Sequence, residues 1–189
     1  LLHPAVRAMV VVASHVKDVL VQDGVPAERI EVVYGSFDPD RFHPAVDGGA
    51  VRAELLRGGD PDGRLVGVVA KLRHYKSHDV FLDAAARVLQ EEPGVRFAIV
   101  GPDPDDVRSH LEGMAREFGA ARGVPLENAV VFTGPRQDVP QILAALDVSV
   151  SASATPWEGL SGAMRESLAM ARPVVCTDVG GNRELVRES

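Results

Sequence analysis

The feature that most constrains the fold is the alternation of short apolar runs with amphipathic stretches between residues 65 and 177. Helical periods separate apolar runs that have the length of buried strands. This order is typical of βαβ units, whose strands lie parallel in one sheet covered by helices. We therefore predict an α/β fold with a doubly wound, mainly parallel sheet. The expected strands are Leu65–Ala70, Val95–Val100, Ala129–Thr133, Asp147–Ser151 and Pro173–Thr177.

The stretches between these runs carry apolar residues at helical spacing. Ser77 and Asp138 precede two of the stretches, and Ser77 is the type of residue that caps a helix N-terminus. A further helix is expected from about residue 162 to 171, because Pro173 cannot continue it. The predicted core-facing residues are Val80, Phe81, Ala84 and Val88; Val107, Leu111, Met114 and Phe118; and Ile142, Leu143 and Leu146.

The first 44 residues follow a different pattern. Ala8–Ala13 and Ile30–Val33 are expected strands, and Ser14 is the expected cap of a helix that runs to about Asp23. Residues 34–44 are rich in turn formers. We predict that residues 1–44 are the tail of a preceding domain and the crossover from it. Residues 45–189 should form one doubly wound domain that is cut short at its C-terminus.

Charge and cysteine content exclude several classes of protein. The net charge of −7 argues against non-specific binding of nucleic acid, which needs a clustered basic face. The single cysteine, Cys176, allows no internal disulfide and no metal–thiolate site, and it should be an inert core residue. We expect a cytoplasmic protein. The 17 Arg against three Lys indicate a GC-rich bacterial genome.

Distinctive loops follow all the predicted strands. Because ligands bind outside the carboxyl ends of parallel strands, these loops predict a site at one rim of the sheet. The loop after the fourth strand combines Glu158, a small-residue turn and a helix that contains Glu166. Free N–H groups at such a helix start attract an anion. One carboxylate can face a ligand's sugar and the other its ribose, although both can equally be solvated.

Two of the three lysines, Lys71 and Lys76, flank the loop after the first strand. A flexible ammonium is a point-charge ligand for phosphate, so two of them can neutralise much of a diphosphate. The alternative is a surface pair without a role.

These motifs together resemble the retaining GT-B glycosyltransferases of family 4, also called group 1. The strongest resemblance is the pair Glu158 and Glu166, separated by seven residues and continuing through residues 167–184. Residues 71–76 are similar to the family's Arg-Leu-x-x-x-Lys signature. Further matches are Phe132-Thr-Gly134, Asp138, Ala145-Leu-Asp147 and Gly35–Asp38. The resemblance implies the Rossmann-like, C-terminal donor-binding half of a GT-B fold.

The resemblance also implies roles for single residues. Glu158 should bind the transferred hexose, and Glu166 the ribose hydroxyls of a nucleotide-diphosphate sugar. Lys71 and Lys76 should hold the diphosphate without a metal ion or another cofactor. Backbone N–H groups should assist them, and a second loop should lie against the base. The remaining donor-binding residues implied are Gly159, Leu160, Ser161 and Gly162 for the phosphates, and Gly134 and Arg136 for the base.

The acceptor, a sugar, lipid or small molecule, should bind mainly to an N-terminal domain that this fragment lacks. The fragment alone should therefore bind donor but transfer little, and peripheral contact with a membrane would come from the missing domain. Two rival functions remain: a nucleotide-sugar 2-epimerase of the same fold, and a non-catalytic nucleotide-sugar-binding module.

Several positions depart from the family pattern. Lys71 replaces the usual Arg, and Ser161 and Ala171 stand where Gly is common. Arg165 lies beside Glu166, as a surface residue or as the partner of a carboxylate. Three Asp-Pro-Asp segments, at 38–40, 60–62 and 103–105, are expected to serve turns rather than metals. His74 and His78 are expected to be solvated, and Trp157 packs either on the sugar-side loop or in the core.

Overall fold

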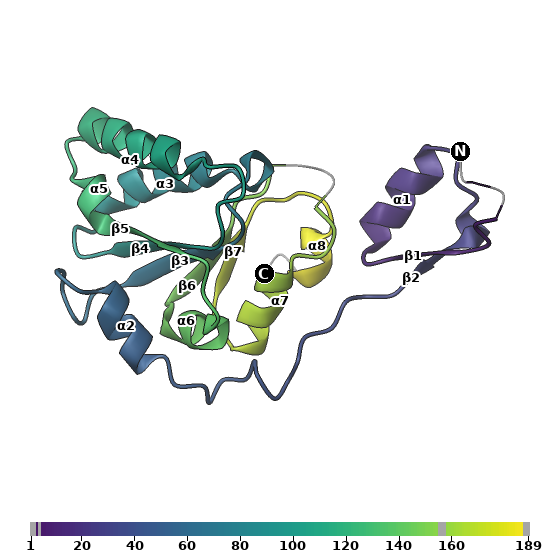
Figure 1. Ribbon diagram of the computed structural model, residues 1–189, viewed down its shortest axis with the longest axis horizontal. Coiled ribbons are helices and arrows are strands. Elements are labelled where there is room, and N and C mark those ends of the chain that lie inside the picture. The colour runs from purple at the N-terminus through teal and green to yellow at the C-terminus, as the bar shows by residue number, and fades with distance from the viewer. Residues whose placement is uncertain (1–2, 4, 155–157, 187–189) are drawn as a thin grey trace.

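The chain folds into a five-stranded parallel sheet and a separate two-stranded parallel sheet (Figure 1). The computed structural model describes residues 3, 5–154 and 158–186. The larger sheet has the order β5-β4-β3-β6-β7, so the chain first builds outward from β3 and then crosses back. Its strands are β3 Leu65–Val69, β4 Arg96–Val100, β5 Val130–Gly134, β6 Val148–Ser151 and β7 Val174–Cys176. The predicted doubly wound sheet is confirmed.

Helices cover the two faces of this sheet in two layers (Figure 1). One layer packs on Val68, Phe97 and Ile99 and comprises α3 His78–Glu91, α4 Arg108–Arg122 and α5 Leu126–Ala129. The other packs on Leu65, Ala98 and Val100 and includes α2 Gly49–Leu55 and α6 Val139–Ala145. α7 Gly162–Ala169 lies against α6, and α8 Asn182–Leu185 follows β7. A 3-10 turn, His74–Lys76, precedes α3.

The predicted core face of α3 is mostly wrong. Phe81 is buried as expected, but Val80 and Val88 are 51% and 41% exposed. The buried face is rotated and includes Leu82, Ala85, Ala86 and Leu89. Apolar residues occur on both sides of this helix, so spacing alone does not select the side that faces β4. Ser77 stands at the N-cap position, but it has a left-handed φ of 47° and its side chain makes no capping bond.

The predicted faces of α4 and α6 are largely confirmed. Leu111 is buried in α4, and Val107, Met114 and Phe118 pack against the same core half-buried. In α6, Ile142 and Leu143 are fully buried. β7 differs from the expected buried strand: Val175 is 59% exposed and Cys176 is only half-buried. In the part of the chain that the structure describes, β7 is an edge strand of the sheet, and its one neighbouring strand is β6.

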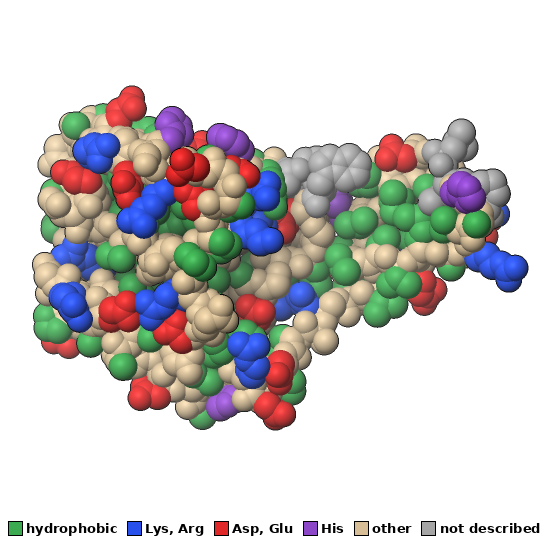
Figure 2. All heavy atoms as spheres, in the orientation of Figure 1, with side chains coloured by type: hydrophobic (Ala, Val, Ile, Leu, Met, Phe, Trp, Pro, Cys, Tyr) green, Lys and Arg blue, Asp and Glu red, His purple; other side chains and the backbone are tan. Residues whose placement is uncertain are grey.

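The N-terminal unit consists of β1 Met9–Val11, α1 Ser14–Gln22, a 3-10 turn Ala27–Arg29 and β2 Ile30–Val32. Residues 33–48 then run along the larger sheet's domain to α2 (Figure 1). Hydrophobic side chains gather on the visible surface of the unit (Figure 2), and Val10 is 68% exposed. A two-stranded sheet with one helix is marginally stable by itself, so the unit depends on its contacts with other parts of the protein.

None of the helices in the described part of the chain is both long and apolar enough to pass through a bilayer.

Candidate functional site

The loops after the five parallel strands meet at one rim, because all the strands run in the same direction. Hydrogen bonds join neighbouring loops. The Leu72 N–H donates to Pro102 O at 2.9 Å, and the Gly101 N–H donates to Gly134 O at 3.0 Å. The Ala154 N–H donates to Tyr75 O at 3.1 Å. The rim predicted from the sequence is therefore a continuous surface of loop backbone.

The start of α7 presents unpaired donors at this rim. Ser161 is the N-cap of the helix, and its hydroxyl oxygen accepts a hydrogen bond from the Met164 N–H at 3.5 Å. The N–H groups of Leu160, Ser161 and Gly162 donate to no acceptor among the residues that the structure describes. Such N–H groups, together with the helix dipole, favour an anion. The serine in place of the usual glycine thus supplies the cap and leaves these donors available.

Glu158 lies in the loop just before α7 and its side chain is 11% exposed. Its Oε2 accepts hydrogen bonds from Lys76 Nζ at 2.6 Å and from the Ser153 hydroxyl at 2.7 Å. The sequence predicted that Glu158 and Lys76 share a site, and the structure brings them into direct contact. Ser153 was not predicted, because a serine five residues before a glutamate carries no recognisable signal.

Glu166 lies within α7, half-buried, and its carboxylate makes no hydrogen bond or ion pair with the described residues. Burial raises its pKa, while the positive charges of Arg165 and Arg41 act in the opposite direction. A partly desolvated carboxylate without a partner is ready to accept hydrogen bonds from a ligand. Among the described residues Arg165 has no carboxylate partner; its guanidinium donates to Ser36 O at 2.8 Å and so holds the crossover segment against α7.

The two remaining predicted cations, Lys71 and Arg136, differ in their ion pairing. Lys71 is exposed at the rim, and among the described residues its ammonium has no ion-pair partner. Arg136 instead forms ion pairs with Glu54 at 2.6 Å and with Asp138 at 2.7 Å. Hydrogen bonds to these carboxylates raise the pKa of Arg136. Its charge is therefore neutralised within the protein.

Comparison with known proteins identifies the family. The family model described as "Glycosyl transferases group 1" matches residues 63–189. The chain belongs to the group 1 glycosyl transferases.

Relatives of this group 1 chain are longer proteins. The lipopolysaccharide core biosynthesis mannosyltransferase LpsB of Rhizobium meliloti is 32% identical over 155 residues, which are 82% of this chain and 42% of that protein. A D-inositol 3-phosphate glycosyltransferase of Thermomonospora curvata is 33% identical over 175 residues, covering 87% of this chain and 39% of that protein. The chain thus spans about two fifths of the length of these curated relatives.

The fold is shared with solved glycosyltransferases. The structure of Anabaena Alr3699/HepE in complex with UDP and glucose superposes with a TM-score of 0.82 and 25% sequence identity. The match covers 96% of this chain and 47% of that chain. The five-stranded parallel sheet with its two helix layers is therefore the Rossmann-like domain of GT-B glycosyltransferases.

The N-terminal unit packs against the loop that carries Glu158 and Gly159. A Cβ atom at Gly159 would lie 2.9 Å from Val12 Cγ2, so a larger residue there would have to displace the Val12 side chain. Gly180 has φ +55°, and a Cβ there would lie 1.9 Å from Glu158 O. The Gly181 N–H donates to Glu158 O at 3.1 Å. The two glycines of the Gly180-Gly181 motif therefore hold the backbone of Glu158 from the β7 side, a role that the sequence did not indicate.

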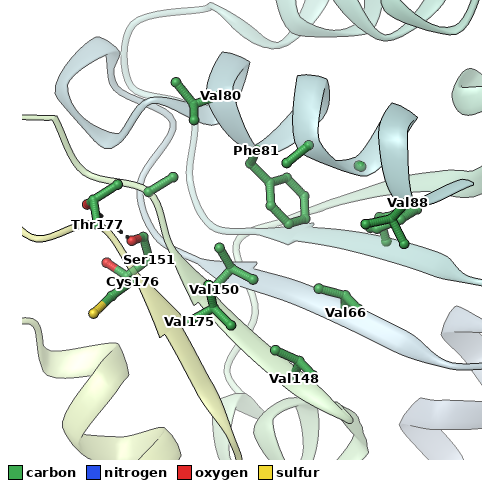
Figure 3. Close-up of a pocket in the computed structure, with 14 residues that line it drawn as sticks. Val66, Val80, Phe81, Val88, Val148, Val150, Ser151, Val175, Cys176 and Thr177 are labelled. Atoms are coloured by element: carbon green, nitrogen blue, oxygen red, sulfur yellow. Dashed lines mark hydrogen bonds between the residues drawn. The ribbon is translucent and has the colours of Figure 1, made fainter. Parts of the chain in front are cut away.

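A cavity along the sheet face differs in chemistry from the rim. An apolar groove of about 370 Å³ lies between α3 and the sheet face of β6 and β7 (Figure 3). Val80, Val88, Val148, Val150 and Val175 point into it, and it contains no charged side chain. Because a diphosphate needs cations or N–H donors, the groove cannot be its site. The candidate site is therefore identified by the charges and N–H donors at the rim, and not by cavity volume.

The surroundings of His78, of the Asp-Pro-Asp segments and of Cys176 test three further predictions from the sequence. His78 is 2% exposed, so the expectation that it is solvated is wrong; burial lowers its pKa, and its Nε2 lies 3.1 Å from Lys71 O. The Asp-Pro-Asp segments serve the backbone as expected. Asp103, for example, accepts from the N–H groups of Val107 and Arg108 at 2.9 Å. Cys176 is half-buried rather than a core residue, and burial raises its pKa. Trp157 lies outside the described residues.

Proposed function

We propose that this chain supplies the donor site of a retaining glycosyltransferase that moves a hexosyl group from a nucleotide-diphosphate sugar to an acceptor. The proposal rests on one observation: a carboxylate, an ammonium and free backbone N–H groups lie together at one rim of the sheet. The carboxylate is that of Glu158, the half-buried ammonium is that of Lys76, and the free N–H groups are those of the α7 start. Relatives with UDP and glucose bound have the same fold, which supports a nucleotide sugar as the ligand.

The donor would span the rim from β5 to β6. Lys71, Lys76 and the N–H groups of Leu160 to Gly162 would contact the diphosphate. Glu166, half-buried and unpaired among the described residues, would accept hydrogen bonds from the ribose hydroxyls. Glu158 would contact the hexose. The backbone at Gly134 would lie against the base, since the Arg136 charge is already paired.

The reaction breaks the bond between the anomeric carbon and a phosphate oxygen, and the electron pair leaves with the diphosphate. An acceptor oxygen forms the new glycosidic bond, and its proton passes to the departing diphosphate. Negative charge therefore grows on the diphosphate in the transition state, where Lys71, Lys76 and the α7 N–H groups stabilise it more than in the ground state. This scheme requires no metal ion. The acceptor would bind mainly outside residues 45–189, and residues 1–44 would belong to the acceptor side and the crossover.

Calorimetric titration with UDP, GDP and ADP, each with and without a hexose, tests the proposal. We expect saturable binding of one nucleotide. Glu166→Ala should weaken it at least about tenfold, as expected for hydrogen bonds to a charged group, and Lys76→Ala should also weaken it. Glu117→Ala, which removes an exposed carboxylate on α4, is the matched control and should change nothing.

Two results would contradict the proposal. Unchanged affinity in Glu166→Ala would exclude its ribose role, and no binding to any of the nucleotides would exclude a donor site in this chain. Release of UDP from a UDP-sugar by the longer protein, without any acceptor, would favour the 2-epimerase instead.

A further inference from the structure

The carboxylate of Glu158 is held by two side chains of different character. Lys76 Nζ and Ser153 Oγ both donate to the same oxygen, Oε2, at 2.6 and 2.7 Å. The second oxygen, Oε1, accepts no hydrogen bond from the described residues. One oxygen is thus anchored, and the other is available to a hydroxyl group of a bound molecule.

The two anchors differ in what a donor would do to them. An ammonium on a flexible four-carbon stem follows the strongest nearby negative charge. In the proposed function a diphosphate arrives next to Lys76, so the lysine must share its protons between phosphate and Glu158 or turn to the phosphate entirely. Ser153 is neutral and 1% exposed, so an incoming phosphate neither attracts it nor reaches it. Only this hydroxyl keeps the same position throughout.

Two hydrogen bonds hold the backbone at Ser153 and at the residue that follows it. The Thr177 hydroxyl, at the end of β7, donates to Ser153 O at 2.5 Å. The next residue, Ala154, donates its N–H to Tyr75 O, in the turn that carries Lys76. A serine side chain has a single torsion before its hydroxyl, so a fixed backbone also fixes the oxygen. Ser153 therefore connects the ends of β6 and β7 and the 74–76 turn to one carboxylate oxygen.

We propose that Ser153 is a positioning residue of the donor site. Its hydroxyl keeps the Glu158 carboxylate directed at the hexose while Lys76 serves the diphosphate. The inference rests on the proposed function, because it assumes that Glu158 contacts the sugar. It predicts a separation of effects: loss of the Ser153 hydroxyl affects recognition of the sugar and leaves recognition of the nucleotide intact.

Titration of Ser153→Ala with UDP and UDP-glucose, and with the corresponding GDP and ADP pairs, tests this separation. In the parent chain the hexose should add to the affinity. In Ser153→Ala we expect this gain to fall about tenfold, the loss of one hydrogen bond to a charged group. The affinity for the nucleotide without sugar should stay the same. Equal losses for both ligands, or no loss for either, would overturn the proposal.

Ser153→Thr is the matched variant, because it keeps the hydroxyl and adds only a methyl group. A cavity of about 20 Å³ borders Ser153, Lys76 and Ser161, which is space for about one water-sized group. Ser153→Thr should therefore retain the gain from the hexose. Thermal unfolding of both variants shows whether any loss reflects the site or the fold, and a Thr variant that folds but loses the gain would contradict the role of the hydroxyl.

A ligand-free measurement keeps this proposal separable from the proposed function. In a crystal structure of Lys76→Ala the charged anchor is gone, and we expect Glu158 Oε2 to remain within hydrogen-bond distance of Ser153 Oγ. A carboxylate that turns away in that variant would overturn the role of Ser153 even where nucleotides bind. If no nucleotide binds the parent chain, the donor-site proposal fails and takes the role of Ser153 with it.

Discussion

At the scale of single residues, two positions that the family pattern singled out have structural rather than chemical roles. Ala171 follows α7 with a φ of +54°, the left-handed conformation that usually calls for glycine. Asp147 precedes β6 and accepts hydrogen bonds from the Leu65 N–H at 2.8 Å and from Arg52 at 3.0 Å. Ala171 therefore holds a strained backbone conformation. Asp147 supplies a hydrogen-bond acceptor to the Leu65 N–H at the start of β3.

Ala171→Gly should stabilise the chain by about 0.5–1 kcal/mol, because relief of the left-handed strain outweighs the added freedom of the unfolded state. Chemical denaturation measures the change. The same substitution at Ala84, in the middle of α3, is the control and should destabilise by about 1 kcal/mol. A destabilising Ala171→Gly would show that this position carries no strain.

Asp147→Ala should destabilise by about 1–3 kcal/mol, because it leaves the Leu65 N–H without its acceptor and removes the carboxylate that pairs with Arg52. Asp147→Asn, which keeps one acceptor oxygen, should cost less. The control is Asp105→Ala, whose carboxylate forms an exposed ion pair with Arg73 at 3.3 Å and should be worth little. Equal effects of Asp147→Ala and Asp105→Ala in denaturation would refute the structural role.

At the scale of elements, α1 obtains its N-terminal cap from a remote part of the chain. Its N-cap residue is Ala13, and Ser14 is inside the helix, so the prediction that Ser14 caps it is wrong. Glu184 of α8 accepts from the N–H groups of Ser14 and His15 at 3.0 Å each. It also accepts from the Tyr34 hydroxyl at 2.8 Å. One carboxylate thus docks the N-terminal unit on the domain of the larger sheet.

Glu184→Gln should undock this cap in part, because an amide offers only one acceptor oxygen. We expect hydrogen exchange of the Ser14 and His15 amides to become about fivefold faster, as for the loss of a helix cap worth about 1 kcal/mol. Asp18→Asn, an exposed carboxylate on α1 itself, is the control. Unchanged exchange in Glu184→Gln would show that the unit is held by other contacts.

The same contact predicts a pH dependence. Burial would raise the pKa of Glu184, but the hydrogen bonds from His15, Ser14 and Tyr34 outweigh it and hold the pKa below its usual value of 4.5. A lowered carboxyl pKa adds stability above the usual value, and this stability is lost as the pH falls through the lowered pKa. The protection factors of the Ser14 and His15 amides, which correct for the pH dependence of intrinsic exchange, should therefore fall below about pH 4.5 in the parent and much less in Glu184→Gln.

At the scale of the whole molecule, the sheet is covered unevenly. α3, α4 and α5 cover β3, β4 and β5 on one face, but no helix of the described residues covers the same face over β6 and β7, where the apolar groove lies (Figure 3). Valines at its base are therefore exposed where a parallel strand is usually buried on both faces. The prediction of a buried last strand failed for this reason, not because the residues were misjudged.

Val175→Thr should change the free energy of unfolding by no more than about 0.5 kcal/mol, because Val175 is 59% exposed. It should also lower the binding of a hydrophobic dye to the groove. Val68→Thr, at a position that is 2% exposed on the neighbouring core, should instead cost about 1–3 kcal/mol. A large stability loss in Val175→Thr would mean that the groove is filled in solution.

The sequence by itself determined the βαβ order, the strand positions and the placement of Glu158 and the lysine loop at one rim of the sheet. Those depend on local hydrophobicity and on the rule that parallel strands end at one edge. Only the tertiary structure decided that Ser153 anchors Glu158, that Glu184 caps α1, that Arg136 is already neutralised and that His78 is buried. Each of these depends on which distant side chains share a space, and periodicity along one chain carries no information about that.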